Sequence, residues 1–151
     1  MNFQKDSDYR KLCTKKLTQS DLTKLRDAIL NSFFFEFYIE DLPMWGFFGT
    51  VTDDTESLFD TSNEKIYLYP HFHFKIGYHK KTQQIVDVSM YTQDKFKVDI
   101  TDANLKELEV QFSYSVEYFE SKTSWQNRFK KYTHSKFYPQ KIKVCDDVYF
   151  Y

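Results

Sequence analysis

The chain has 151 residues, a formal net charge of −1 and a pI near 6.4, which is the size of one domain that buries roughly two thirds of its unfolded surface. Because the charge is balanced, the chain as a whole gives no electrostatic reason to expect a nucleic acid or an anionic lipid as its partner. Aromatic residues make up 20% of the sequence, whereas Gly and Pro number three each, which excludes a linker or a collagen-like repeat and favours β-sheet.

The first sixteen residues are mixed and charged and lack the apolar region of a signal peptide, and no apolar run approaches the ~18 residues of a membrane helix. As written, the sequence predicts a soluble chain. Cys13 and Cys145 lie near opposite ends of the chain without a CxxC or Cys/His cluster, so zinc-finger spacing is absent. The sequence does not decide whether the two form a disulfide.

One helix is well signalled near the N-terminus. Thr18 can cap it, and Asp21 stands three residues later as in a capping box. Leu17 and Leu22 are placed as a hydrophobic staple. We predict a helix over residues 19–32 whose apolar stripe packs on a sheet; the stripe consists of Leu22, Leu25, Ile29 and Phe33.

The pattern then changes to a period of two residues, which predicts a strand over residues 33–39. The tripeptide Asp41-Leu42-Pro43 predicts a turn, because proline restricts the preceding residue and has no N–H. A second short strand is predicted to hold alternating residues from Trp45 to Val51. The acidic residues 52–64 that follow predict an exposed loop.

Apolar side chains next fall on even positions over residues 66–78, interrupted at Pro70, while the odd positions carry His71, His73 and His79. Side chains two apart on a strand leave the same face, so the odd positions predict an exposed polar face. His71 and His73 are therefore weak candidates for a zinc site that a carboxylate or a third histidine would complete. The alternative is a surface or hydrogen-bonded histidine pair without a metal.

Alternation continues over residues 86–90 and 96–100 and is longest over residues 108–118, where Val110, Phe112 and Val116 alternate with Ser113 and Ser115. This pattern predicts a long strand with one face in a core and the other in solvent. The chain is thus predicted to be mainly β, an antiparallel two-layer sandwich of the jelly-roll kind with one helix near the N-terminus.

Residues 122–143 carry seven basic residues and no acidic one, with aromatic residues interleaved between Trp125 and Tyr132. Cations mixed with aromatics suit a surface for single-stranded nucleic acid or anionic lipid, but the same pattern is more commonly an amphipathic helix turn whose aromatics pack while its charges are solvated. Because the pI is not basic, we expect no nucleic-acid partner.

Motifs for catalysis are absent from the sequence. It has no GxSxG, HExxH, P-loop or dinucleotide glycine pattern, and its three glycines cannot form a phosphate-binding loop. We therefore predict no enzyme activity, no catalytic residue and no cofactor.

Five blocks, taken in order, resemble the luminal region of the transmembrane nine superfamily, the nonaspanins. They read LCTKKL from Leu12, FEFYIEDLPMWGFFG from Phe35, YLYPHFH from Tyr67, FSYSVEY from Phe112 and NRFKKY from Asn127. The most specific is DLPMWGFFG, which begins at Asp41. The resemblance covers roughly residues 2–144, and the H-x-H of His71 and His73 is similar to that of some members.

This resemblance implies a luminal, mostly β domain over residues 1–144, incomplete at its N-terminus, that precedes nine membrane helices in Golgi or endosomal membranes. Residues 145–151 form a divergent tail where family members enter the first membrane helix, so the chain is expected to be a fragment of a longer protein. The family is linked to sorting and surface delivery of membrane proteins, to adhesion and to phagocytosis. The implied partners are membrane-protein cargo and the protein's own membrane helices, with membrane association only in the full-length protein.

Two hypotheses follow. In the first, the chain is a non-catalytic binding module whose interaction surface includes Met44, Trp45, Phe48, His71 and His73. In the second, it is a soluble β-sandwich that binds a small ligand or a metal through His71 and His73.

Overall fold

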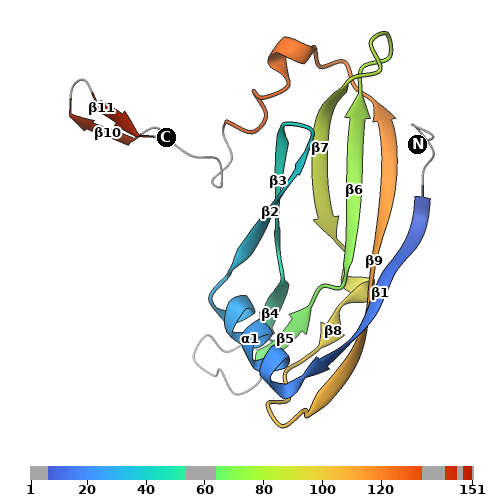
Figure 1. The fold of residues 1–151 in the computed structure, drawn as a ribbon, viewed down its shortest axis with the longest axis vertical. Coiled ribbons are helices and arrows are strands. Elements are labelled where there is room, and N and C mark those ends of the chain that lie inside the picture. The colour runs from blue at the N-terminus through green and yellow to red at the C-terminus, as the bar shows by residue number, and fades with distance from the viewer. Residues whose placement is uncertain (1–6, 54–63, 134–141, 146–147, 151) are drawn as a thin grey trace.

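The computed structural model describes residues 7–53, 64–133, 142–145 and 148–150. The described residues form β-strands with one α-helix near the N-terminus, which confirms the predicted mainly β class (Figure 1). In chain order the elements are β1 (Ser7–Thr18), α1 (Gln19–Leu30), β2 (Phe34–Ile39), β3 (Leu42–Phe47), β4 (Gly49–Asp53), β5 (Glu64–Leu68), β6 (His71–Tyr78), β7 (Ile85–Thr92), the 3₁₀ turn η2 (Asp94–Phe96), β8 (Val98–Asp99), β9 (Glu107–Glu120), the 3₁₀ turn η3 (Trp125–Asn127), β10 (Ile142–Cys145) and β11 (Val148–Phe150).

The helix begins as the sequence predicts, because the Thr18 side chain accepts the Asp21 backbone N–H and the Asp21 carboxylate accepts the Thr18 N–H. It ends at Leu30, two residues before the predicted end, since Ser32 takes a left-handed φ of 54°. Phe33 consequently leaves the apolar stripe and is 60% exposed. The stripe instead includes Arg26, which is buried and donates to the carbonyl of Ile100.

The β2–β3 hairpin turns at Glu40 and Asp41, earlier than predicted, and places Leu42 and Pro43 inside β3. In a two-residue hairpin the residues beside the turn form a hydrogen-bonded pair. The next pair, Tyr38–Pro43, therefore needs no N–H from the proline. This register explains why a strand tolerates Pro43 here.

The largest sheet has the strand order β1-β9-β6-β7, and smaller sheets join β2-β3, β4-β5-β8 and β10-β11. Among the described strands all pairs are antiparallel except β6 and β9, which run parallel (Figure 1). The largest sheet is therefore mixed rather than purely antiparallel, because the chain crosses over between β6 and β9 through β7 and β8. The segment predicted as one strand over residues 66–78 is divided at Pro70 between two sheets, as β5 and β6.

Two apolar clusters fill the space between the largest sheet and the elements that cover one of its faces. One joins α1 and β5 to Val110 of β9, and the other joins Leu42 and Met44 of β3 to β6 and β7. Val110 is buried, and Phe112 and Val116 pack against these clusters, which confirms the predicted inner face of the long strand. The predicted acidic loop falls almost entirely on residues 54–63, outside the described residues.

Candidate functional site

A group of polar side chains joined by hydrogen bonds lies where β6 runs beside β9. The parallel register pairs His71 with Ser113 and His73 with Ser115, so the side chains meet on one face. His71 Nδ1 lies 2.8 Å from the Ser113 hydroxyl oxygen and Nε2 lies 2.9 Å from that of Ser115. His73 Nδ1 lies 2.8 Å from the same Ser115 oxygen, and its Nε2 lies 3.3 Å from Glu117 Oε2. We call these five residues the histidine network.

The distances allow one consistent direction of donation when both imidazoles are neutral. Hydrogen bonds from Lys75 and His73 hold the pKa of Glu117 below its usual value, so its carboxylate only accepts. His73 then donates from Nε2 and accepts the Ser115 O–H at Nδ1. Ser115 in turn accepts from His71 Nε2, and His71 Nδ1 accepts the Ser113 O–H.

His71 is buried, at 2% exposure, which contradicts its predicted place on an exposed face. Its ring stacks against that of Tyr9 in β1, with the ring centroids 5.7 Å apart. The centroid of the Phe96 ring lies 4.0 Å from that of His71. These two rings cover the histidine, and burial is the main cause that lowers its pKa; the charges of His73 and Lys95 lower it further. A contact surface therefore cannot use the His71 side chain.

His73 is partly buried, and a cavity of about 490 Å³ lies beside it, lined by both imidazoles together with Lys95 and Glu117. His79 lies beyond the end of β6 and shares a hydrogen bond with Thr82, so it does not join the pair as an unbroken strand would require. In the part of the chain that the structure describes, no group of three or more His, Cys, Asp or Glu side chains is arranged to hold a metal ion. Both nitrogens of each imidazole have a hydrogen-bond partner, which is the arrangement of the metal-free alternative.

The aromatic segment of β3 divides between core and surface. Met44 is 3% exposed and packs in the second apolar cluster, so it is not part of an exposed contact surface. The reason is the strand alternation, which turns Met44 toward the largest sheet. Trp45 and Phe48 are partly buried, with Trp45 at 6.5 Å from the ring of Tyr132 and Phe48 at 5.2 Å from that of Phe35.

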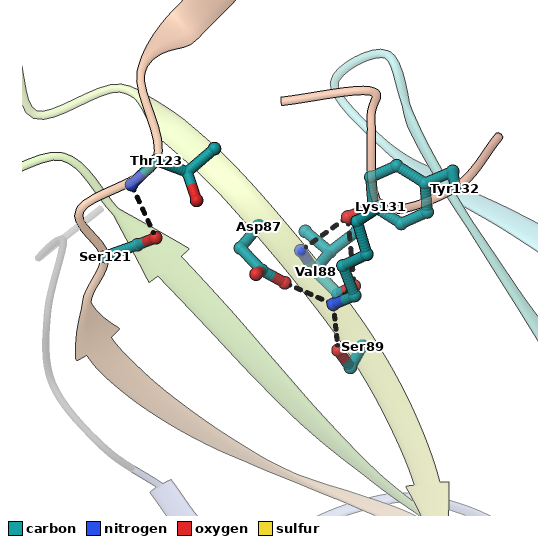
Figure 2. A network of polar contacts seen from close by, with 7 residues as sticks. All are labelled: Asp87, Val88, Ser89, Ser121, Thr123, Lys131 and Tyr132. Atoms are coloured by element: carbon teal, nitrogen blue, oxygen red, sulfur yellow. Dashed lines mark hydrogen bonds and ion pairs between the residues drawn. The ribbon is translucent and has the colours of Figure 1, made fainter. Parts of the chain in front are cut away.

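The described part of the basic segment attaches to the rest of the fold. Figure 2 shows the Lys131 ammonium donating to the carboxylate of Asp87, the hydroxyl of Ser89 and the carbonyl of Val88. The Tyr132 hydroxyl accepts the Val88 N–H at 2.8 Å and donates to the Val88 carbonyl at 3.1 Å. This segment therefore satisfies backbone groups of β7, the strand at the edge of the largest sheet.

Arg128 joins the same segment to the β2–β3 hairpin. Its guanidinium donates to Asp41 at 2.5 Å and lies 3.6 Å from the centre of the Trp125 ring. The cations of Arg128 and Lys131 thus face acidic groups of the same chain. The hydrogen bonds of Arg128 are also the first cause that lowers the pKa of Asp41.

The sequence pattern did not predict Ser113, Ser115, Glu117 or Tyr9 as site residues; it assigned Ser113 and Ser115 to the solvent face of the long strand. The predicted solvent face of the long strand is in fact buried at Ser113 and Ser115, which are 2% and 4% exposed. Side-chain size could have indicated this burial, since these two serines are shorter than the other polar side chains on the same face of the strand. Short hydroxyl side chains leave room for rings from a neighbouring strand.

The structure also brings together the blocks that carry the family resemblance. Asp41 of DLPMWGFFG contacts Arg128 of NRFKKY, and the two histidines of YLYPHFH contact the serines of FSYSVEY. Four of the five blocks therefore form two sets of contacts.

The structure is thus a mainly β fold with a mixed sheet, in which His71, His73, Ser113, Ser115 and Glu117 are hydrogen-bonded to one another. The family model for endomembrane protein 70 matches residues 1–148, and the chain belongs to this family. It is 32% identical over 144 residues to transmembrane 9 superfamily member 2 of Arabidopsis thaliana and 33% identical to member 3, covering 95% of this chain and 23% of each relative. It is also 25% identical over 142 residues to putative phagocytic receptor 1b of Dictyostelium discoideum, covering 94% of this chain and 22% of that protein.

The chain thus spans less than a quarter of the length of these relatives. No solved structure matches it. Among the described residues, no helix has the length and apolar character needed to cross a bilayer.

Proposed function

We propose that this chain forms the luminal, non-catalytic domain of a multi-spanning endomembrane protein that takes part in sorting and localising membrane proteins. The observation that carries the proposal is the match of 95% of the chain to relatives that are more than four times longer and are named for their transmembrane character. The name of the Dictyostelium relative, a putative phagocytic receptor, also supports a role in membranes.

In this proposal the domain acts through its surface and not through a reaction. The side chains with catalytic potential, His71 and His73, are bonded to serines and to Glu117. Trp45 and Phe48 remain candidates for contact with cargo or with the luminal ends of the membrane helices, because both are only partly buried. Golgi or endosomal membranes are the proposed location.

The test uses the full-length protein tagged at its own gene. We expect the tag to fractionate with Golgi or endosomal membranes and the domain to resist protease until the membrane is opened with detergent. Loss of the gene should lower the amounts of particular multi-spanning proteins at the cell surface, measured by surface biotinylation and mass spectrometry. An unchanged surface proteome would reject the sorting role, and digestion in sealed vesicles would reject the luminal side.

A second candidate function is binding of a small ligand or a metal by His71 and His73. The cavity of about 490 Å³ that both rings line favours it. Titration of the chain with zinc, with His73→Ala as the control, tests the metal. Equally weak binding by parent and variant would reject it.

A further inference from the structure

A second cavity, of about 530 Å³, lies among α1, β1, β2, β5, β6 and β9. It adjoins the first apolar cluster, since Leu17, Leu68 and Phe112 both belong to that cluster and line the cavity. Eight of its twelve lining residues are Leu or Phe. Its volume is in the range of small-molecule sites, roughly 300–1,000 Å³, and its lining has the apolar character of such sites.

The wall of this groove is built from phenylalanine rings that hold one another in place. The Phe35 ring packs edge-on against Phe48 and against Phe72, with centroids 5.2 Å apart in both pairs, and lies 5.0 Å from Phe37. Leu17 and Leu68, which are almost fully buried, form the floor of the groove. Phe37 is 45% exposed, so the groove opens to solvent on its side.

Two lysines, Lys15 of β1 and Lys24 of α1, line the same groove. Neither has an ion-pair partner among the described residues. The acidic residue of the lining is Asp21, whose carboxylate is already bonded to the N–H and hydroxyl of the helix cap residue Thr18. The charges of Lys15 and Lys24 also act on the Asp21 carboxylate and help to lower its pKa, after the hydrogen bonds from Thr18. The groove therefore combines an apolar wall with two lysines and one carboxylate, a net positive charge of one.

We propose that this groove binds a free long-chain fatty acid, with its acyl chain against the phenylalanine rings and its carboxylate beside Lys15 and Lys24. The apolar lining accounts for the chain, because each buried methylene contributes a fixed increment of affinity. The lysines account for the acid, because they attract an anion and repel the cations that aromatic rings would otherwise accept. The proposal is independent of the sorting role.

The experiment uses the full 151-residue chain. Displacement of the fluorescent probe 11-(dansylamino)undecanoic acid measures the Kd of saturated fatty acids of increasing length. We expect each added methylene to lower the Kd by about fourfold until the groove is filled. Methyl esters of the same acids, which lack the charge, should bind more weakly.

Matched variants test the lysines and the apolar wall of the groove separately. The double variant Lys15→Gln/Lys24→Gln should raise the Kd of dodecanoate roughly three- to tenfold and leave that of its methyl ester unchanged. The control Lys11→Gln/Lys106→Gln removes the same charge from exposed positions that do not line the groove. These four lysines are exposed, so the variants keep the fold, which circular dichroism checks.

The apolar half is tested by Phe37→Ser, which should weaken binding of acid and ester alike by about tenfold. Its control is Phe33→Ser, since Phe33 is 60% exposed and lies outside the groove lining. The proposal is overturned if the parent chain does not displace the probe, if acid and ester bind equally, or if both lysine pairs have the same effect. Binding to phosphatidylcholine and phosphatidylserine vesicles without binding of free dodecanoate would also overturn it.

Discussion

Replacing Tyr132 by Phe removes one oxygen atom and tests whether the basic segment holds the edge of the largest sheet. Tyr132 is 4% exposed, and its hydroxyl both accepts from and donates to the backbone of Val88, which is 1% exposed (Figure 2). Phe keeps the ring, so the second apolar cluster stays filled. The substitution therefore changes hydrogen bonding and little else.

The expected cost follows from what each backbone group loses. The Val88 carbonyl keeps the ammonium of Lys131 at 3.2 Å, whereas the Val88 N–H is left buried without a partner. An unsatisfied buried donor costs about 1–3 kcal/mol and a lost hydrogen bond about 1 kcal/mol. We expect the free energy of unfolding to fall by about 2–3 kcal/mol.

Urea unfolding followed by far-UV circular dichroism measures this change, and hydrogen exchange of the Val88 amide should quicken in parallel. The control is Tyr91→Phe, because the Tyr91 side chain is half exposed and should change stability by less than about 0.5 kcal/mol. A loss below about 0.5 kcal/mol for Tyr132→Phe, or an unchanged Val88 exchange rate, would refute the reasoning.

Alkaline pH gives a second signature of the same hydroxyl. Burial raises the pKa of Tyr132 to about 12, so the folded protein keeps the phenolic proton that the unfolded chain loses above its ordinary value of 10.0. The parent chain should therefore lose stability as the pH rises from 10.0 toward 12, and Tyr132→Phe should lose less over the same interval.

Three further substitutions test other contacts. Gly49→Ala should cost about 2 kcal/mol or more in thermal or urea unfolding, because a Cβ there would overlap the carbonyl oxygen of Tyr67 on the paired strand. Arg128→Lys should cost about 1–2 kcal/mol in urea unfolding, since an ammonium cannot reproduce both the fork to Asp41 and the stacking on Trp125. For His71, burial lowers the folded-state pKa below 6.5, so stability falls as the pH drops below that value; His71→Gln should flatten urea-derived stability between about pH 7 and pH 5.

Each of these has a result that would contradict it. Gly46→Ala is the comparison for Gly49, because its Cβ would meet side-chain atoms of Met90 and Phe35 rather than a backbone carbonyl, and it should cost less. Equal losses for both glycines would show that the backbone overlap does not matter. A cycle of Arg128→Lys with Asp41→Asn should show coupling, and strict additivity would remove the ion pair from the explanation. An unaltered pH slope in His71→Gln would mean that the histidine network does not contribute to acid stability.

Local signals predicted the fold well where one segment alone determined the outcome. The cap at Thr18 and the alternation around Val110 each follow from neighbouring residues, and both elements formed as expected. The division at Pro70 and the parallel pairing of β6 with β9 depend on which distant strand becomes the neighbour. No periodicity within a segment carries that information.

The same distinction between local and distant contacts explains why only part of the candidate site was predicted. The spacing of His71 and His73 correctly placed both rings on one face of a strand. It could not show that Tyr9 and Phe96 would cover His71, because those rings come from β1 and from the turn after β7. Likewise, the groove beside α1 exists only because six separate elements meet there.

The partnership of β1 with β9 has a consequence for biosynthesis. Residues 7–18 leave the ribosome about a hundred residues before their hydrogen-bonding partner on residues 107–120. The earliest strand must therefore wait, unpaired, for most of the domain to be translated. We expect nascent chains halted before residue 107 to recruit chaperones at the first strand, and those that have fully released residue 120 to shed them.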